Sequence, residues 1–293
     1  MTGLVALGAQ PLPGLASIAS QPFLRYAFVA GAAIAAASGL VGYFLVLRSQ
    51  VFTGDALSHV AFTGSLAALA AGADLLVGLY GGCLIVALAM AALGPRGEAD
   101  DTVIGSVFAW ILGLGALFLG IYVTSPTGAN GTSGVSVLFG TIFGLSATQA
   151  VADSTVALGV CVVIVLIGRP LVFASIDDAV AGARRVPVRF LGFLFLGLVG
   201  LTAAAATQAV GALLLLGLLA APAGAAQRLT ARPFVGLWLS AGLAIFSMWT
   251  GLLIAYAAPQ IPPSFGILAV ATGVYLAAIA LTATGRRASA ATG

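Results

Sequence analysis

The sequence predicts an all-α polytopic membrane protein, built as a bundle of eight or nine transmembrane helices. Hydrophobic residues make up 61% of the 293 residues and charged residues only 6%, and the mean hydropathy is +1.17. Uncharged runs recur at membrane-spanning length, which is about 20 residues. The run between Arg25 and Arg48 holds 22 residues, and the run between Arg232 and Arg286 holds 53, enough for two spans. No polar stretch is long enough to fold as a separate soluble domain.

The order of apolar and polar segments predicts one domain with short ends. We expect a short N-terminal leader over residues 1–22, a single transmembrane domain over 23–287 and a C-terminal tail over 288–293. An apolar stretch at residues 135–145 is too short to cross a membrane, so it predicts a re-entrant or interfacial helix. The expected spans are about 23–47, 54–73, 75–93, 103–123 and 150–172, two within 189–228 divided by a turn at 202–208, then 234–257 and 266–284. The count falls to eight if one short span is re-entrant.

The positions of the arginines predict the orientation. If Arg48 is cytoplasmic and nine spans alternate, ten of the eleven arginines lie on the cytoplasmic side, as the positive-inside rule requires. Only Arg25 lies on the other side. This pattern favours an odd number of spans with the N-terminus outside. Because the arginines are scattered among loops and the net charge is only +3, we expect no nucleic-acid partner.

The chain contains no lysine. A phosphate-binding loop of the Walker A type needs a lysine on the nucleotide phosphates, so this chain cannot carry that site. If ATP drives its activity, another chain must bind the nucleotide. We therefore do not expect the chain to be an enzyme.

Asp55 and His59 form the candidate metal site. They lie four residues apart, which places them one turn apart on the same face of a helix. Ionisable groups inside a membrane are costly and usually have a function, and a carboxylate with a neutral imidazole can bind one divalent cation. His59 is the only histidine of the chain. A structural, hydrogen-bonded core histidine is the alternative.

Four stretches resemble the membrane permeases of ABC importers for zinc, manganese or iron. The most specific runs from Gly39 to Arg48 and continues into Gly54-Asp55-Ala56-Leu57-Ser58-His59, which is similar to a Gly-Asp-x-x-x-His motif of that family. The other three are individually weak but occur in the expected order: Asp101-Thr102-Val103-Ile104-Gly105, Leu138-Phe139-Gly140, and Val210-Gly211-Ala212-Leu213-Leu214 through to Pro222-Ala223.

The resemblance implies a transmembrane permease subunit for ATP-driven uptake of a divalent transition metal, Zn²⁺ first and Mn²⁺ second, that holds no permanent cofactor. It also implies a homodimer that lines one path in a bacterial inner membrane, a separate ATPase and an extracytoplasmic metal-binding protein. Membrane lipid surrounds such a protein. The polar loop after residue 173 is similar to the family's coupling segment, which implies that four residues contact the ATPase: Asp177, Asp178, Ala179 and Gly182.

Two other functions remain open at this point. In a proton-coupled secondary transporter, Asp55, His59 and Asp153 would relay protons. A subunit that only supports assembly, without transport, is the third possibility. The residues alone do not rank zinc, manganese and iron, because Asp with His suits all three.

Overall fold

Every long element of the described chain is a helix. The computed structural model describes residues 21–94, 100–124, 137–176 and 187–291. Within these ranges, nine helices have 15 or more residues: α2 (Pro22–Leu47), α3 (Val51–Ala70), α4 (Leu75–Leu93), α5 (Asp101–Thr124), α7 (Ala147–Ile176), α9 (Val188–Val210), α10 (Leu215–Leu229), α11 (Pro233–Ala257) and α12 (Pro263–Ala291). A short 3₁₀ helix, η2, covers Ile142–Gly144. The all-helical prediction is confirmed.

Seven of these helices are long and apolar enough to cross a membrane: α2, α4, α5, α7, α9, α11 and residues 263–283 of α12. The other two, α3 and α10, are part of the same bundle. Helix α3 has 20 residues but carries the polar candidate site, and α10 has only 15. The described chain thus has seven clear candidate spans among its nine long helices, in line with a polytopic membrane protein.

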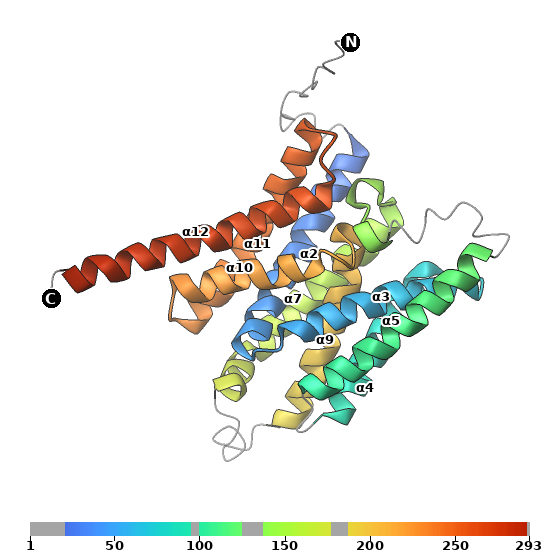
Figure 1. The fold of residues 1–293 in the computed structure, drawn as a ribbon, viewed down its shortest axis with the longest axis horizontal. Helices are drawn as coiled ribbons and strands as arrows, with labels where there is room; N and C mark the ends of the chain where they lie inside the picture. Colours follow the sequence, from blue (N-terminus) through green and yellow to red (C-terminus); the bar gives the residue numbers. More distant parts are fainter. Residues whose placement is uncertain (1–20, 95–99, 125–136, 177–186, 292–293) are drawn as a thin grey trace, which may run out of the picture.

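Helices α2 and α9 form the centre of the bundle. In their apolar windows 78% of the residues are buried, against 17% in α5 and 22% in α12. Helix α2 packs against α7, α10 and α11, and α3 packs against α4, α5 and α9. In Figure 1, α3, α4 and α5 lie together on one side, while the end of α12 extends away from the bundle. Helix α12 continues to Ala291, through most of the segment expected to be a C-terminal tail.

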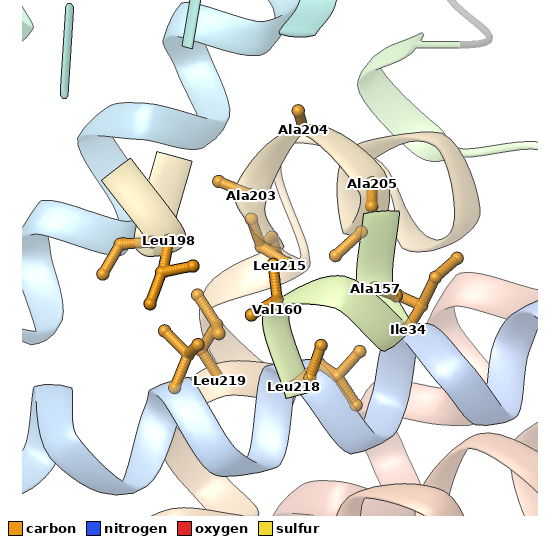
Figure 2. Packing of buried hydrophobic residues seen from close by; sticks show 14 of the residues in the cluster. Ile34, Ala157, Val160, Leu198, Ala203, Ala204, Ala205, Leu215, Leu218 and Leu219 are labelled. Carbon is orange, nitrogen blue, oxygen red and sulfur yellow. The ribbon is translucent and has the colours of Figure 1, made fainter. Parts of the chain in front are cut away.

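The centre of the bundle is filled by small and branched side chains. Figure 2 shows the alanines of α9 (Ala203, Ala204 and Ala205) beside leucines of α10 (Leu215, Leu218 and Leu219), with α2 and α7 completing the contact. Without a strong hydrophobic force between helices in lipid, close packing of small residues is a main source of their association. This packing fixes the helices around which the candidate site is arranged.

The turn predicted at residues 202–208 is wrong. Helix α9 runs without interruption to Val210, and the chain breaks at Gly211, whose φ is +92°. The alanine-rich run favours helix. The hydroxyls of Thr202 and Thr207 donate to the carbonyls four residues earlier, over 2.8 and 2.7 Å. Both hydroxyls are therefore hydrogen-bonded within the helix. The helix ends later than predicted, at Gly211, because glycine readily adopts the positive φ found there.

The re-entrant or interfacial helix predicted at residues 135–145 is not one continuous helix in its described part, which begins at Val137. Helical backbone ends at Phe139, Gly140 has a φ of +74°, and η2 follows. The apolar composition of the stretch was correctly read, but Gly140 divides it. Residues 177–186, which include the predicted coupling residues, lie outside the described part of the chain.

Candidate metal-transport site

Asp55 and His59 lie one turn apart on α3, as predicted. Both are half-buried, in a helix whose other side chains are mostly buried. The His59 ring meets the ring of Phe108 on α5 edge to face, with 5.2 Å between their centroids. The pair therefore faces the seam between α3 and α5, which lie side by side in Figure 1.

A cavity of about 280 Å³ opens in this seam next to Asp55. It is lined by Phe52 and Asp55 of α3 and by Asp101, Ile104, Gly105 and Phe108 of α5. A Cβ added at Gly105 would have no atom within 4 Å, so a larger side chain would extend into open space. The cavity brings two carboxylates, Asp55 and Asp101, to the same opening.

Asp101 is a functional candidate that the sequence reasoning missed. It was noted only as the first residue of a motif, because nothing in its local spacing connects it to a residue 46 positions earlier. Asp101 begins α5 and is exposed. Its position could have indicated a function, because it is an aspartate at the start of a span in a chain with only eight acidic residues.

Hydrogen bonds join α3 beneath the pair to α5 and to the segment between α9 and α10. The Ser58 hydroxyl lies 2.7 Å from the carbonyl oxygen of Asp55 and 2.9 Å from that of Ala212. The Thr63 hydroxyl donates to the Ile111 carbonyl of α5 over 3.1 Å. The contacts with Ala212 and Ile111 fix α3 against its neighbours without using the side chains of Asp55 and His59. These two side chains thus remain available for a ligand.

Two motifs that lie 70 residues apart in the sequence meet behind α3. The amide of Ala212 donates to the carbonyl of Val137 over 3.2 Å, and that of Leu213 to Leu138 over 3.3 Å. A Cβ at Gly140 would lie 2.6 Å from the Gly211 nitrogen, and one at Gly211 would lie 2.6 Å from the Gly140 nitrogen. Both glycines also have a positive φ. Only glycine fits this crossing, which satisfies the backbone groups freed where α9 ends.

Helices α3 and α4 are in backbone contact. A Cβ added at Gly64 would lie 2.4 Å from the Gly78 carbonyl oxygen, and one at Gly78 would lie 2.2 Å from the Gly64 oxygen. The Cys83 thiol of α4 also donates to the Leu57 carbonyl over 3.4 Å. This close approach sets the position of α3, and with it the position of Asp55 and His59 in the bundle.

A second polar cluster lies between α4, α7 and α9. Asp153 is fully buried, and its Oδ1 accepts hydrogen bonds from the Tyr80 hydroxyl over 2.5 Å and from Gln208 Nε2 over 3.0 Å. Its Oδ2 has no hydrogen-bond partner in the described part of the chain. No hydrogen bond between described residues links Asp153 to Asp55 or His59.

The described residues of one chain contain no group of three or more His, Cys, Asp or Glu side chains able to hold a metal ion. The predicted ligand set of one chain is thus two side chains on one face of α3, Asp55 and His59, with Asp101 across the neighbouring cavity. An incomplete ligand set suits a transported cation, which must be released, better than a structural metal, which is held by four ligands.

Comparison with known proteins gives a consistent family. The ABC 3 transport family matches residues 20–282. The manganese transport system membrane protein MntC of Halalkalibacterium halodurans is 31% identical over 237 residues, covering 80% of this chain and 78% of that protein. The chelated iron transport system membrane protein YfeD of Yersinia pestis is 28% identical, covering 69% of this chain and 67% of that protein.

A solved structure has the same fold. PsaBC from Streptococcus pneumoniae in complex with Fab matches with a TM-score of 0.77 and 25% sequence identity, over 90% of this chain and 93% of the matched chain. The similarity extends across the bundle, including the helices that carry the candidate site. The chain belongs to the ABC 3 transport family and is the multi-pass membrane permease of a bacterial ABC importer for metal ions of the manganese and zinc type, not itself catalytic.

Proposed function

We propose that the transported ion passes along the face of α3 that carries Asp55 and His59, and that Mn²⁺ is its first physiological cargo, with Zn²⁺ second. The observation that carries this proposal is the cavity where Asp55 and Asp101 share one opening. Asp55 supplies a carboxylate beside His59, and Asp101 adds a second carboxylate to the lining of the cavity without forming one ligand group with this pair. Oxygen ligands suit Mn²⁺ better than soft-ligand sites do. The relatives named for manganese transport support manganese as the first cargo, in place of the zinc expected from the sequence.

The path is completed by a second copy of the chain. One protomer supplies only two ligands on α3, whereas a two-fold axis beside α3 and α5 would bring a second Asp55 and His59 to the same ion. Helix α5 is the least buried of the candidate spans, so this side of the bundle has surface free for a partner. The homodimer thus accounts for both the missing ligands and the exposed helix.

Energy and cargo come from other chains. A permease of an ABC importer implies an ATPase subunit and a binding protein that delivers the metal. We place the ATPase contact at Asp177, Asp178, Ala179 and Gly182, all outside the described residues. ATP-driven closure of the ATPase pair would shift the permease dimer between outward-facing and inward-facing states, which is alternating access.

Uptake measurements on the metal pair test the proposal. His59→Ala and Asp55→Ala should each abolish uptake of radioactive Mn²⁺, with unchanged membrane abundance. Asp55→Asn should be nearly as severe, because it keeps the shape of the side chain and removes the charge that offsets the cation. A packing role predicts the reverse order, with Asn tolerated and Ala harmful through lost protein. Wild-type uptake by His59→Ala would end the claim that this pair touches the metal.

A further inference from the structure

Arg25 stands apart from the other arginines, and the transport site does not use it. It is exposed at the start of α2, at the opposite end of this helix from Arg48. It forms no ion pair with any residue in the described ranges, and by the arginine pattern it lies on the extracytoplasmic side. An arginine there opposes the positive-inside rule, so it needs a separate explanation.

Arg25 lines a cavity of about 300 Å³ between the first turns of α2 and α7. Tyr26 and Val29 of α2 and Val151 and Ser154 of α7 also line it. The Ser154 hydroxyl donates within its own helix, to the Ala150 carbonyl over 2.6 Å. Arg25 and Tyr26 therefore supply the side-chain donors that are free to meet a ligand at this opening.

A second, apolar cavity of about 580 Å³ continues from the first. Leu158 lines both cavities. The second runs between α2, α7 and α11, with Leu40, Val162 and Trp238 among its lining residues. Val162 and Trp238 are each 58% exposed, so the cavity is an open groove on the outer surface of the bundle. The two cavities meet at Leu158, and we treat them together as a groove with a cation at one end and apolar walls along the rest.

The dimensions and the charge of this groove fit a phospholipid. Tyr26 and Leu40 are about 21 Å apart along α2, at a rise of 1.5 Å per residue. One leaflet of the hydrocarbon core is about 15 Å thick, so the groove can hold an acyl chain along its full length. We propose that it binds an anionic phospholipid of the extracytoplasmic leaflet, with the phosphate on Arg25 and one acyl chain between α2 and α7.

The guanidinium gives the groove its selectivity for anionic lipid. Its planar fork can donate two parallel hydrogen bonds to a phosphate. A zwitterionic headgroup also carries a cation, which weakens its net attraction to Arg25. The Tyr26 ring suits the membrane interface, where its apolar body and polar hydroxyl are both satisfied. A lipid held in this way would join α2, at the centre of the bundle, to the start of α7.

The fluorescence of Trp238 can report occupancy, because this residue lines the groove and the chain has only two other tryptophans. The full-length chain would carry Trp110→Phe and Trp249→Phe and be purified in detergent. Phosphatidylglycerol or phosphatidylcholine with brominated acyl chains is then titrated. We expect phosphatidylglycerol to quench half of the Trp238 fluorescence at a concentration about fivefold lower than that needed with phosphatidylcholine. This factor corresponds to about 1 kcal/mol per arginine.

Variants separate a built lipid site from general lipid contact. Arg25→Gln should remove the preference for phosphatidylglycerol, while Arg189→Gln, an exposed arginine at the start of α9, should keep it. Val151→Phe should weaken quenching by both lipids while Arg25 is intact, because it narrows the groove. Gel filtration would confirm that each variant has the wild-type elution profile.

Four results would overturn the proposal. Equal quenching by the two lipids would show annular contact only, and an unchanged preference in Arg25→Gln would exclude this cation. Relief of quenching by 10 mM inorganic phosphate, roughly ten thousand times a micromolar dissociation constant, would indicate a free-phosphate site. A fourth test uses copies that carry Val162→Cys. If they form an intermolecular disulfide at the same yield with and without phosphatidylglycerol, the groove is an interface between copies.

Discussion

Gln208 donates a hydrogen bond from Nε2 to Oδ1 of Asp153 over 3.0 Å, joining α9 to α7 at a fully buried carboxyl group. The Tyr80 hydroxyl of α4 donates to the same oxygen. Because α3 packs on both α4 and α9, this cluster holds together the two helices that support α3 and its candidate metal pair, Asp55 and His59. Asp153 thus has a positioning role that can be tested apart from transport chemistry.

We expect Asp153→Leu to destabilise the protein by about 1–3 kcal/mol, because it leaves the buried donors of Tyr80 and Gln208 without an acceptor. Asp153→Asn keeps an acceptor oxygen and should stay near wild type in stability and in uptake. Thermal unfolding of the purified chain and Mn²⁺ uptake normalised to membrane protein measure both. Ser154→Ala, one residue away and half-buried, is the control. If Asp153→Asn were stable but failed to transport, the carboxyl charge itself would be needed and a positioning role would be wrong.

The local parts of the site could be predicted from sequence. The four-residue spacing of Asp55 and His59 places them on one face in any helix, and α3 confirms this. Asp101 was missed because its relation to Asp55 depends on how α5 packs on α3, which no local pattern contains. The same holds for Tyr80 and Gln208, which look like ordinary residues of apolar spans until the helices are packed.

The break between α9 and α10 shows why helix ends were harder to predict. Residues 202–208 contain two threonines and a glutamine, which suggested a turn, but the threonine hydroxyls bond within the helix. The true end, Gly211, is fixed by a tertiary contact with Gly140. The composition correctly indicated a break between two helices in this region. The packing of the helices determined the residue at which the break occurs.

Gly140 and Gly211 should each be intolerant of a side chain. Gly211→Ala would force a Cβ to 2.3 Å from the Leu138 carbonyl oxygen at a φ of +92°. We expect a loss of about 1–3 kcal/mol from backbone strain alone. Gly140→Ala should act similarly, and the double variant should cost less than the sum, because both alter one crossing. Gly113→Ala on α5 is the control, since nothing lies within 4 Å of its added Cβ. Wild-type unfolding temperatures for Gly211→Ala would contradict the crossing.

The purified chain should hydrolyse no ATP. It has no lysine with which to form a Walker A phosphate loop. The expected result is a rate equal to that of a mock purification from cells lacking the gene. Hydrolysis should appear only after a partner ATPase is added. A rate that follows the permease through gel filtration and remains in the absence of any ATPase subunit would refute the separation of transport from hydrolysis.

The cavity between α3 and α5 gives the last prediction, which separates ion passage from folding. Gly105→Leu should fill the space beside Asp55 without a clash, because no atom lies within 4 Å of an added Cβ. Glycine in a helix interior is also destabilising by roughly 0.5–1 kcal/mol relative to alanine, so substitution should not lower stability. Uptake of Mn²⁺ should nevertheless fall strongly, because the side chain blocks the opening shared by Asp55 and Asp101. Gly105→Ala is the matched control and should transport nearly as well as wild type. Asp101→Asn should weaken Mn²⁺ uptake with normal membrane abundance, by less than Asp55→Asn does, because Asp101 is exposed and at the edge of the cavity. Full uptake by Gly105→Leu at wild-type abundance would mean that the ion does not pass through this seam, even if Asp55 and His59 prove essential.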